Sequence, residues 1–249
     1  MISLGFDPSI TGYGWCLHDS EAEGPARVVE RGLLSSSAKT VFVKRYMDFR
    51  DHLAKLVEAH PEIECIGIES PVYGEQWSPG AYALFVYTNE VVYTHRKDVV
   101  YFDPGTVKML AKLDPRIRKG KMFKDDMVAA ARADTGITGR FNHNEADAYH
   151  VAKFAARFFL RLDDKIADDD LTPSEFRAFA RVHTPKKGKH AGETVYHGAL
   201  FKEHSCFFRF SKLEPLHERD PRQEGSPQRD APEGSSCKGS GPKGSASEG

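Results

Sequence analysis

Short apolar stretches alternate with longer amphipathic ones along most of this 249-residue chain. Ile2, Leu4 and Phe6 alternate with small residues, which predicts a buried strand that ends on Asp7. A proline then stops the strand, and two glycines permit a tight turn into an antiparallel strand over 13–18. The first two strands are therefore expected to form a hairpin with a carboxylate beside its turn.

The rest of the pattern predicts strands and helices in alternation. Apolar residues recur at helical spacing before Pro61, and Pro104 stands where a helix prefers its first residue. Strands are predicted over 27–34, 64–69 and 99–103, and helices over 39–60, 81–95, 144–158 and from Pro104 onward. This order predicts an α/β fold whose sheet is antiparallel at first and parallel afterwards.

Two of the predicted strands end in the same way. Asp7 precedes Pro-Ser and Glu69 precedes Ser-Pro, so each carboxylate stands where a buried strand leaves the core. A single aspartate at such a place usually caps a turn, but the recurrence favours a shared role. A third acid, Asp147, precedes Val151 by four residues and therefore lies on the apolar, core-facing stripe of the helix over 144–158.

Three carboxylates buried close together have strongly raised pKa values unless a cation neutralises them. Oxygen ligands without cysteine suit Mg²⁺ or Mn²⁺, which complete their coordination with water and phosphate. The pattern therefore predicts a divalent-metal site formed by Asp7, Glu69 and Asp147.

These residues carry a resemblance to a known family. Gly-Phe-Asp-Pro-Ser at 5–9, Thr-Gly-Tyr-Gly at 11–14, Ile68-Glu69 and Ala-Asp-Ala at 146–148 resemble the RuvC-type Holliday-junction resolvases of the RNase H-like superfamily. The resemblance covers residues 1–160. It implies an RNase H-like mixed five-stranded sheet with flanking helices, two Mg²⁺ or Mn²⁺ ions per site, a homodimer, and branched DNA such as a four-way junction as the partner.

The family usually has a fourth metal ligand, Asp or sometimes His, three residues before the helical aspartate. Asn144 stands there in this chain. Helical spacing places Asn144 and His143 on the face of Asp147, whereas Glu145 contributes only if the helix has not yet begun. Asn144 could instead be the helix N-cap, and Glu145 a first-turn charge favoured by the helix dipole. The fourth ligand therefore stays open among these three residues.

Basic residues concentrate between Leu110 and Met127, in a segment that a proline and a glycine keep out of a continuous helix. The segment is predicted to be a loop that is either simply solvated or in contact with backbone phosphates. The DNA contacts expected there are Arg118, Lys119 and Lys121. By resemblance, Lys108 and Lys124 correspond to two lysines that the family uses near the scissile phosphate.

Two aromatic residues, Tyr73 and Trp77, follow Glu69 in a loop that contains a glycine. Aromatic residues in such a loop belong to a core less often than those on a helix, and they can stack on unpaired bases. The family also has an aromatic residue close to this point, although the spacing here is one residue longer.

The helix over 81–95 is apolar around much of its circumference. This pattern is typical of a core helix and equally of a subunit interface. Related resolvases pair two subunits, so the resemblance implies a dimer.

Composition limits the remaining possibilities. The net charge of −1 means that DNA binding must rely on local basic patches. The four cysteines form no Cys-x-x-Cys pair and indicate reduced thiols. No signal peptide or membrane-spanning apolar stretch is visible. We expect a soluble protein in the cytoplasm of a bacterial or phage-infected cell, without membrane association.

Three regions are expected along the chain. Residues 1–162 are predicted to form the RuvC-like nuclease domain. Residues 163–213 form a basic and aromatic extension with a small helix that begins at Thr172 and a hairpin of strands over 195–201 and 206–210. Residues 214–249 contain almost no apolar residues and are predicted to be a disordered tail.

Three functions are compatible with these patterns. The first is a metal-dependent endonuclease that cleaves Holliday junctions or other branched DNA in recombination, repair or replication. The second is an actin-like or sugar-kinase-like ATPase, but Pro8-Ser9 breaks the expected phosphate-binding turn and the chain is short for two lobes. The third is a catalytically inactive DNA-binding module, an alternative that Asn144 leaves open.

Overall fold

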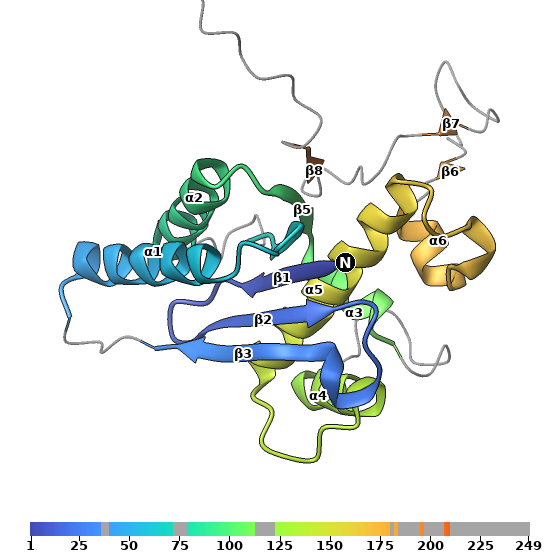
Figure 1. Ribbon diagram of the computed structural model, residues 1–249. Helices are drawn as coiled ribbons and strands as arrows, with labels where there is room; N and C mark the ends of the chain where they lie inside the picture. The colour runs from blue at the N-terminus through green and yellow to red at the C-terminus, as the bar shows by residue number, and fades with distance from the viewer. Residues whose placement is uncertain are drawn as a thin grey trace, which may run out of the picture. The chain divides into compact units, whose positions relative to one another are not determined.

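The computed structural model describes residues 1–35, 40–71, 79–112, 123–179, 182–183, 195–196 and 207–209. Its main sheet has the strand order β3-β2-β1-β4-β5-β8 (Figure 1). The strands are β1 (Ile2–Asp7), β2 (Tyr13–Asp19), β3 (Val28–Leu34), β4 (Cys65–Glu69), β5 (Asp98–Phe102) and β8 (Phe207–Phe208). A separate two-stranded sheet pairs β6 (Val182–His183) with β7 (Val195–Tyr196).

Six α-helices accompany the sheet in the part of the chain that the structure describes. They are α1 (Phe42–Ala59), α2 (Pro79–Thr94), α3 (Pro104–Leu110), α4 (Lys124–Thr135), α5 (His143–Leu162) and α6 (Pro173–Phe179). Two 3₁₀ turns, η1 (Gly24–Arg27) and η2 (Asp168–Asp170), lie in the connections. None of the described helices is long and apolar enough to cross a membrane.

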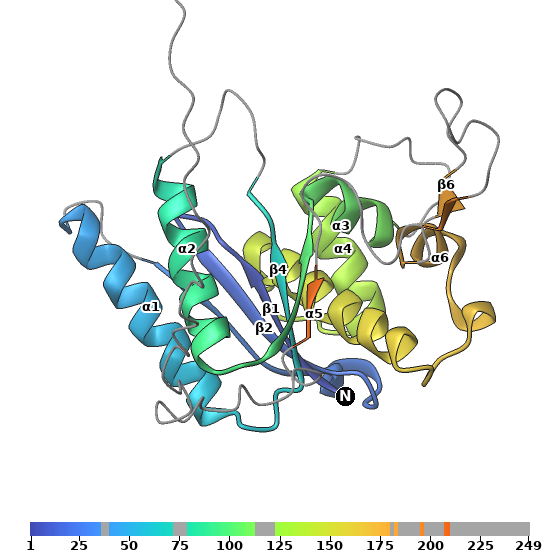
Figure 2. The ribbon, with the colours of Figure 1, turned by 90° about the horizontal axis from the view of Figure 1, so that it is seen from above.

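The pairing of the strands follows the predicted change of direction. β2 runs antiparallel to β1 and to β3, whereas β4 and β5 continue the sheet in parallel. Figure 2 shows α1 and α2 on one face of the sheet and α3, α4 and α5 on the other. The predicted antiparallel-then-parallel α/β arrangement is therefore confirmed.

Alternating strand residues build the two layers of the core. Leu4 and Phe6 on β1 and Ile66 on β4 are fully buried in the cluster that includes residues of α1 and α2. Gly5 and Gly67 point to the opposite face, which α5 covers. Successive side chains of a strand point to opposite faces of the sheet. One face therefore carries bulky side chains, and the other has glycines against which a helix backbone can pack.

Because Gly5 and Gly67 have no side chain, the backbone of α5 packs directly against β1 and β4. A Cβ atom on Gly5 would lie 2.0 Å from the Ala148 carbonyl oxygen, and one on Gly67 would lie 2.7 Å from the Val151 carbonyl oxygen. Any larger residue would push the helix away from β1 or β4. The close contact fixes the first turns of α5 beside the carboxyl ends of these strands.

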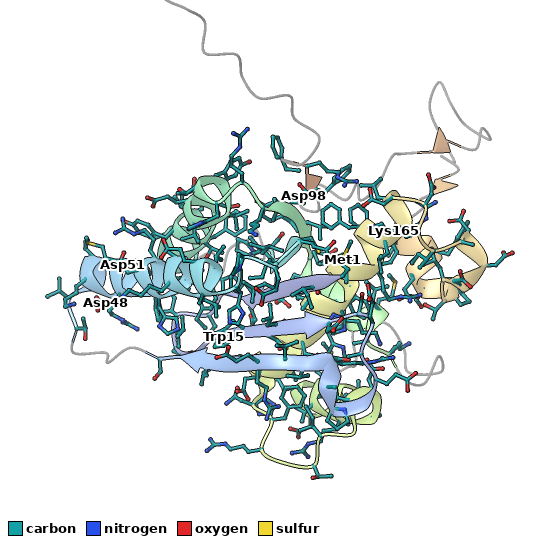
Figure 3. All side chains as sticks on the ribbon, in the orientation of Figure 1. Met1, Trp15, Asp48, Asp51, Asp98 and Lys165 are labelled. Carbon is teal, nitrogen blue, oxygen red and sulfur yellow. The ribbon has the colours of Figure 1, made fainter. Side chains whose placement is uncertain are left out.

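In the described ranges the main sheet has six strands, whereas five were predicted. β8 pairs antiparallel with β5, and Phe207 packs edge-on against Phe158 of α5. Arg209 forms ion pairs with Asp163 at 2.6 Å and with Asp98 at 3.1 Å. Asp98, labelled in Figure 3, is buried at the start of β5. The extension thus contributes a strand to the sheet of the predicted nuclease domain.

Of the two strands predicted over 195–201 and 206–210, the structure describes residues 195–196 and 207–209. β7 pairs with β6, and β8 pairs with β5, so these two segments have different partners. Short strands find partners through tertiary contacts that local patterns do not encode. The helix at Thr172 is confirmed, because the Thr172 hydroxyl accepts a hydrogen bond from Glu175 N and the Glu175 carboxylate accepts one from Thr172 N.

Other boundaries differ from the predicted ones. α1 begins at Phe42, three residues later than predicted, and α4 begins at Lys124, inside the segment predicted to be a loop. Asp125 and Asp126 lie in the first turn of α4, where the helix dipole favours acids, and Asp126 accepts a hydrogen bond from Phe123 N. The predicted tail lies outside the described residues, and the domain boundaries stay predictions.

Candidate active site

Asp7 and Glu69 are the last residues of β1 and β4, which are adjacent parallel strands. The register pairs Phe6 with Ile68, so the two carboxylates leave the sheet side by side. Asp147 comes from the second turn of α5, next to Ala148, whose carbonyl contacts Gly5. Three segments far apart in the sequence thus bring carboxylates to one edge of the sheet.

Burial and mutual repulsion change the acidity of these groups. Burial raises the pKa of Asp7 to about 7, and the Asp147 carboxylate adds to the effect while Lys124 opposes it. Burial raises the pKa of Asp147 to about 6, against the lowering effect of the cations Lys108, Lys124 and His143. Both lysines singled out in the sequence therefore lie within electrostatic range of the acids.

Glu69 is affected most strongly. Burial raises its pKa well above its usual range, and the charges of Asp7 and Asp147 raise it further. Lys108 acts in the opposite direction, and Asp103 adds one more repulsive charge. A cluster of this kind favours any cation that can replace protons between the carboxylates.

The donor set fits a hard divalent cation in its chemistry. Asp147 Oδ1 is buried and has no hydrogen-bond partner among the described residues, which is costly for a carboxylate unless a ligand satisfies it. Only oxygen ligands come from the three acids, as Mg²⁺ and Mn²⁺ prefer. In the described ranges, however, no three His, Cys, Asp or Glu side chains are arranged to hold a metal ion.

A capping box at the N-terminus of α5 determines the roles of Asn142 and Glu145. Asn142 is the N-cap, and its Oδ1 accepts a hydrogen bond from Asn144 N at 2.9 Å. The carboxylate of Glu145 accepts one from Asn142 N at 2.7 Å, which completes a capping box. The alternative role of Asn144 as N-cap is therefore wrong, whereas Glu145 has the first-turn role that was its alternative.

The side chains of Asn144 and His143 differ in their hydrogen bonding. The side-chain amide of Asn144 donates a hydrogen bond to Gly12 O in the β1–β2 turn. His143 Nδ1 is buried without a hydrogen-bond partner in the described part of the chain, and Asp125 Oδ1 lies 3.9 Å from it. His143 precedes Asp147 by one helical turn, so two unpartnered buried atoms share one face of α5.

Sequence reasoning missed Asp103 as a neighbour of the site. Asp103 follows β5 and caps α3, where its Oδ1 accepts a hydrogen bond from Thr106 N at 3.1 Å. The pairing of Glu69 with Phe102 puts Asp103 beside the glutamate strand. The signal in the sequence was the end of the predicted strand on Asp103 directly before Pro104, but only the strand order relates it to Glu69.

Several predicted DNA contacts lie outside the described residues. These are Tyr73, Trp77, Arg118, Lys119 and Lys121. The helix over 81–95, now α2, buries Leu84, Val91 and Val92 and leaves Tyr82, Val86 and Tyr93 each nearly half exposed. Part of its apolar surface is therefore core, and part faces outward.

The sequence matches no protein-family model and no curated protein. Among solved structures, the chain is similar to RuvC of Thermus thermophilus, with a TM-score of 0.53 and 17% identity over 66% of this chain and 97% of that chain. It is also similar to T. thermophilus RuvC in complex with a Holliday junction substrate, with a TM-score of 0.53 and 16% identity over 65% and 96%. These likenesses show that the chain has the RNase H-like α/β fold of RuvC.

Proposed function

We propose that this chain is a divalent-metal-dependent endonuclease that hydrolyses phosphodiester bonds in branched DNA, with the four-way junction as its substrate. The observation that carries the proposal is the meeting of Asp7, Glu69 and Asp147 at one edge of a RuvC-like sheet. The similarity to a RuvC bound to a Holliday junction supports the choice of substrate. A role in recombination, repair or replication follows from that substrate.

In this proposal, Asp7, Glu69 and Asp147 hold two Mg²⁺ or Mn²⁺ ions. When bound, such ions would supply Lewis acidity for the activation of water and for the charge on the leaving 3′ oxygen. The rigid strands β1 and β4 fix two of the ligands, and the glycine contact of α5 fixes the third. His143 and Asn144 are the candidates for a fourth ligand, and the unpartnered Nδ1 favours His143.

Lys108 and Lys124 act on the phosphate in the proposed reaction. Lys108 lies on α3 and Lys124 begins α4, and the charges of both reach Asp147. Ammonium groups beside the carboxylates attract an anionic substrate into an acidic site. They also stabilise the extra negative charge that develops on the phosphate during in-line attack.

The remaining parts of the proposal concern partners. Tyr73 and Trp77 are proposed to stack on bases at the branch point, and Arg118, Lys119 and Lys121 to contact phosphates. The outward side of α2, with Tyr82, Val86 and Tyr93, supports pairing of two copies so that two sites meet two strands. A cytoplasmic location remains part of the same proposal.

A gel assay tests the activity directly. A synthetic four-way junction and a linear duplex of the same sequence are incubated with the protein, with Mg²⁺, with Mn²⁺ or with chelator. The proposal expects nicks placed symmetrically across the junction, only with metal, and little cleavage of the duplex. Junction binding without cleavage under all metal conditions would favour the inactive DNA-binding module instead.

A further inference from the structure

Three arginines surround the loop 136–142, which joins α4 to α5 beside β3 (Figure 1). Arg31 Nη2 donates a hydrogen bond to Arg140 O at 2.7 Å, and Arg132 Nη2 donates one to Gly139 O at 3.1 Å. The Arg31 guanidinium lies 4.1 Å from the centre of the Phe141 ring. Guanidiniums from β3 and α4 therefore hold consecutive carbonyls, and the exposed Arg140 side chain extends from the same loop.

These charges have no acidic partners among the described residues. Arg31, Arg132 and Arg140 form no ion pair within the described ranges, and Arg31 Nη1 is buried without a hydrogen-bond partner. Five other arginines of the described chain are paired with carboxylates, namely Arg27, Arg50, Arg157, Arg161 and Arg209.

The carboxylates of Asp134 and Glu145, which lie near this loop, interact with other groups. Asp134 is paired with Arg27 at 2.9 Å and with Lys153 at 2.6 Å. The Glu145 carboxylate accepts the Asn142 backbone N–H. Like charges held together without acids oppose folding, so their presence points to an anion that binds there.

Phosphate is the anion whose geometry fits. A guanidinium has five N–H donors in a planar fork, and Arg132 uses one of its nitrogens on Gly139 O. The remaining donors match the bidentate geometry of a phosphodiester. An extended ligand with regularly spaced phosphates satisfies several such groups at once, as a nucleic-acid strand does.

The cluster lies close to the carboxylates along the chain. Arg140 precedes His143 by three residues, which span at most about 10 Å. From His143 to Asp147 the helix rises about 6 Å. The Arg140 backbone is therefore within about 16 Å of Asp147, a length that about five nucleotides of one strand cover at 3.4 Å each.

We propose that Arg132 and Arg140 contact backbone phosphates of a DNA arm within about five nucleotides of the scissile bond, while Arg31 holds the loop in place. The inference deepens the proposed function, on which it rests for the identity of the nucleic acid. It assigns the loop 136–142 a role that the predicted basic segment over 110–127 does not cover.

The test measures binding to DNA as a function of salt. The full chain and its Arg132→Gln/Arg140→Gln variant are titrated against a labelled four-way junction and a linear duplex, in chelator, at several salt concentrations. Each lost phosphate contact makes the slope of log K against log salt shallower by about 0.9 and weakens binding at 0.1 M salt about eightfold. The double variant is expected to lose about 1.8 in slope.

Three control variants make the result specific. Arg161→Gln removes the same charge near the far end of α5, where Arg161 is paired with Asp168 at 2.8 Å, and it is expected to keep the wild-type slope. Arg140→Lys keeps the charge and is expected to keep the slope. Arg140→Gln alone alters an exposed side chain, so its effect stands even if Arg132→Gln disturbs folding.

The outcomes separate the inference from the proposed function. An unchanged slope and affinity in the double variant would overturn the inference, even if the wild type cleaves junctions. A shallower slope in a protein that binds DNA but never cleaves a junction would support the arginine contacts and overturn the proposed activity. A wild-type protein that binds neither the four-way junction nor the linear duplex would overturn both the inference and the proposed function.

Discussion

The side-chain amide of Asn144 donates a hydrogen bond to the backbone oxygen of Gly12, and this contact ties the first turn of α5 to the β1–β2 turn. The turn begins directly after Asp7, and α5 carries Asp147. A Cβ atom on Gly14 would lie 2.1 Å from Asn144 O, so backbone and side chain of Asn144 both meet the hairpin. Asn144 therefore sets the separation of two candidate metal ligands.

Because the Asn144 side chain is hydrogen-bonded to Gly12 O, substitutions of His143, Asn144 and Glu145 are expected to differ in their effects on melting temperature and on the Mg²⁺ requirement. Asn144→Ala removes the tie to Gly12 and is expected to lower the melting temperature and to raise the Mg²⁺ concentration needed for cleavage. His143→Ala is expected to raise the Mg²⁺ requirement severalfold without lowering the melting temperature, because Nδ1 has no partner to lose. Glu145→Ala breaks the capping box and is expected to cost about 1 kcal/mol of stability with an unchanged Mg²⁺ requirement.

Thermal melts and cleavage assays over a Mg²⁺ titration provide both measurements for each variant. A loss of metal response confined to Glu145→Ala would show that this carboxylate turns toward Asp147 when substrate binds. An unaltered response of His143→Ala would remove it as a ligand.

Substitution of the strand carboxylate tests the site itself. Asp7→Asn keeps the size of the side chain and removes its charge, so we expect loss of cleavage by at least about a hundredfold while junction binding survives. Glu69→Gln and Asp147→Asn are expected to behave alike. Asp48→Asn, an exposed change on α1, serves as the control. Cleavage by Asp7→Asn at close to the wild-type rate would show that the catalytic acids lie elsewhere.

The carboxylates could be located from sequence because local patterns place them. Alternation along β1 and β4 sets the ends of both strands, and Asp7 and Glu69 occupy those ends. Asp147 follows from the apolar stripe of α5. Their meeting at one edge needed the resemblance to a known fold, because periodicity does not give strand order.

The features that sequence reasoning missed depend on contacts between distant segments. β8 has two residues, and its pairing with β5 depends on the fold around Phe207 and Arg209. The N-cap is a different case. Asn142 followed three residues later by Glu145 is a capping-box signature that was available in the sequence and that distinguishes Asn142 from Asn144.

Two truncations test the role of the extension. Removal of residues 215–249 is expected to leave the melting temperature and cleavage nearly unchanged, because that composition cannot bury enough apolar surface to form a core. Removal of residues 206–249 also deletes Phe207 and Arg209, and with Arg209 its ion pair with the buried Asp98. We expect a loss of about 3–5 kcal/mol from the broken pair.

Chemical denaturation of the full chain and both truncations gives the comparison. Equal stability of the two truncations would mean that β8 adds nothing to the sheet in solution. Arg209→Ala in the full chain separates the ion pairs from the loss of the strand.

The last prediction follows from the raised pKa values of the carboxyl groups in the site. With chelator present, the pKa of Asp7 is expected to be about 7 in the folded state because of burial and the Asp147 charge, against about 3.9 in the unfolded chain. Between these values the folded state binds more protons than the unfolded state at this residue. Its contribution to the free energy of unfolding therefore falls as pH rises from about 4 to about 7.

Two buried histidines act in the opposite direction. Burial lowers the pKa of His18 and of His150 to about 4 in the folded state, so the unfolded chain binds more protons than the folded state from pH 4 to about 6.5. They add stability as pH rises through that range and mask the effect of Asp7 in a simple pH profile. Both proteins contain these histidines, so their contribution cancels in the difference between the free energies of unfolding of wild type and Asp7→Asn.

We therefore expect the stability advantage of Asp7→Asn over wild type, measured by denaturation in chelator, to grow from pH 5 to pH 8. Each pH unit between 5 and the folded pKa of about 7 contributes about 1.4 kcal/mol to that growth. Saturating Mg²⁺ at pH 8 should reduce the advantage, because ions that bind the folded wild type stabilise it by mass action. A difference that stays constant with pH would mean that the Asp7 carboxylate is already paired in solution, and the electrostatic argument for a cation at this edge of the sheet would fail.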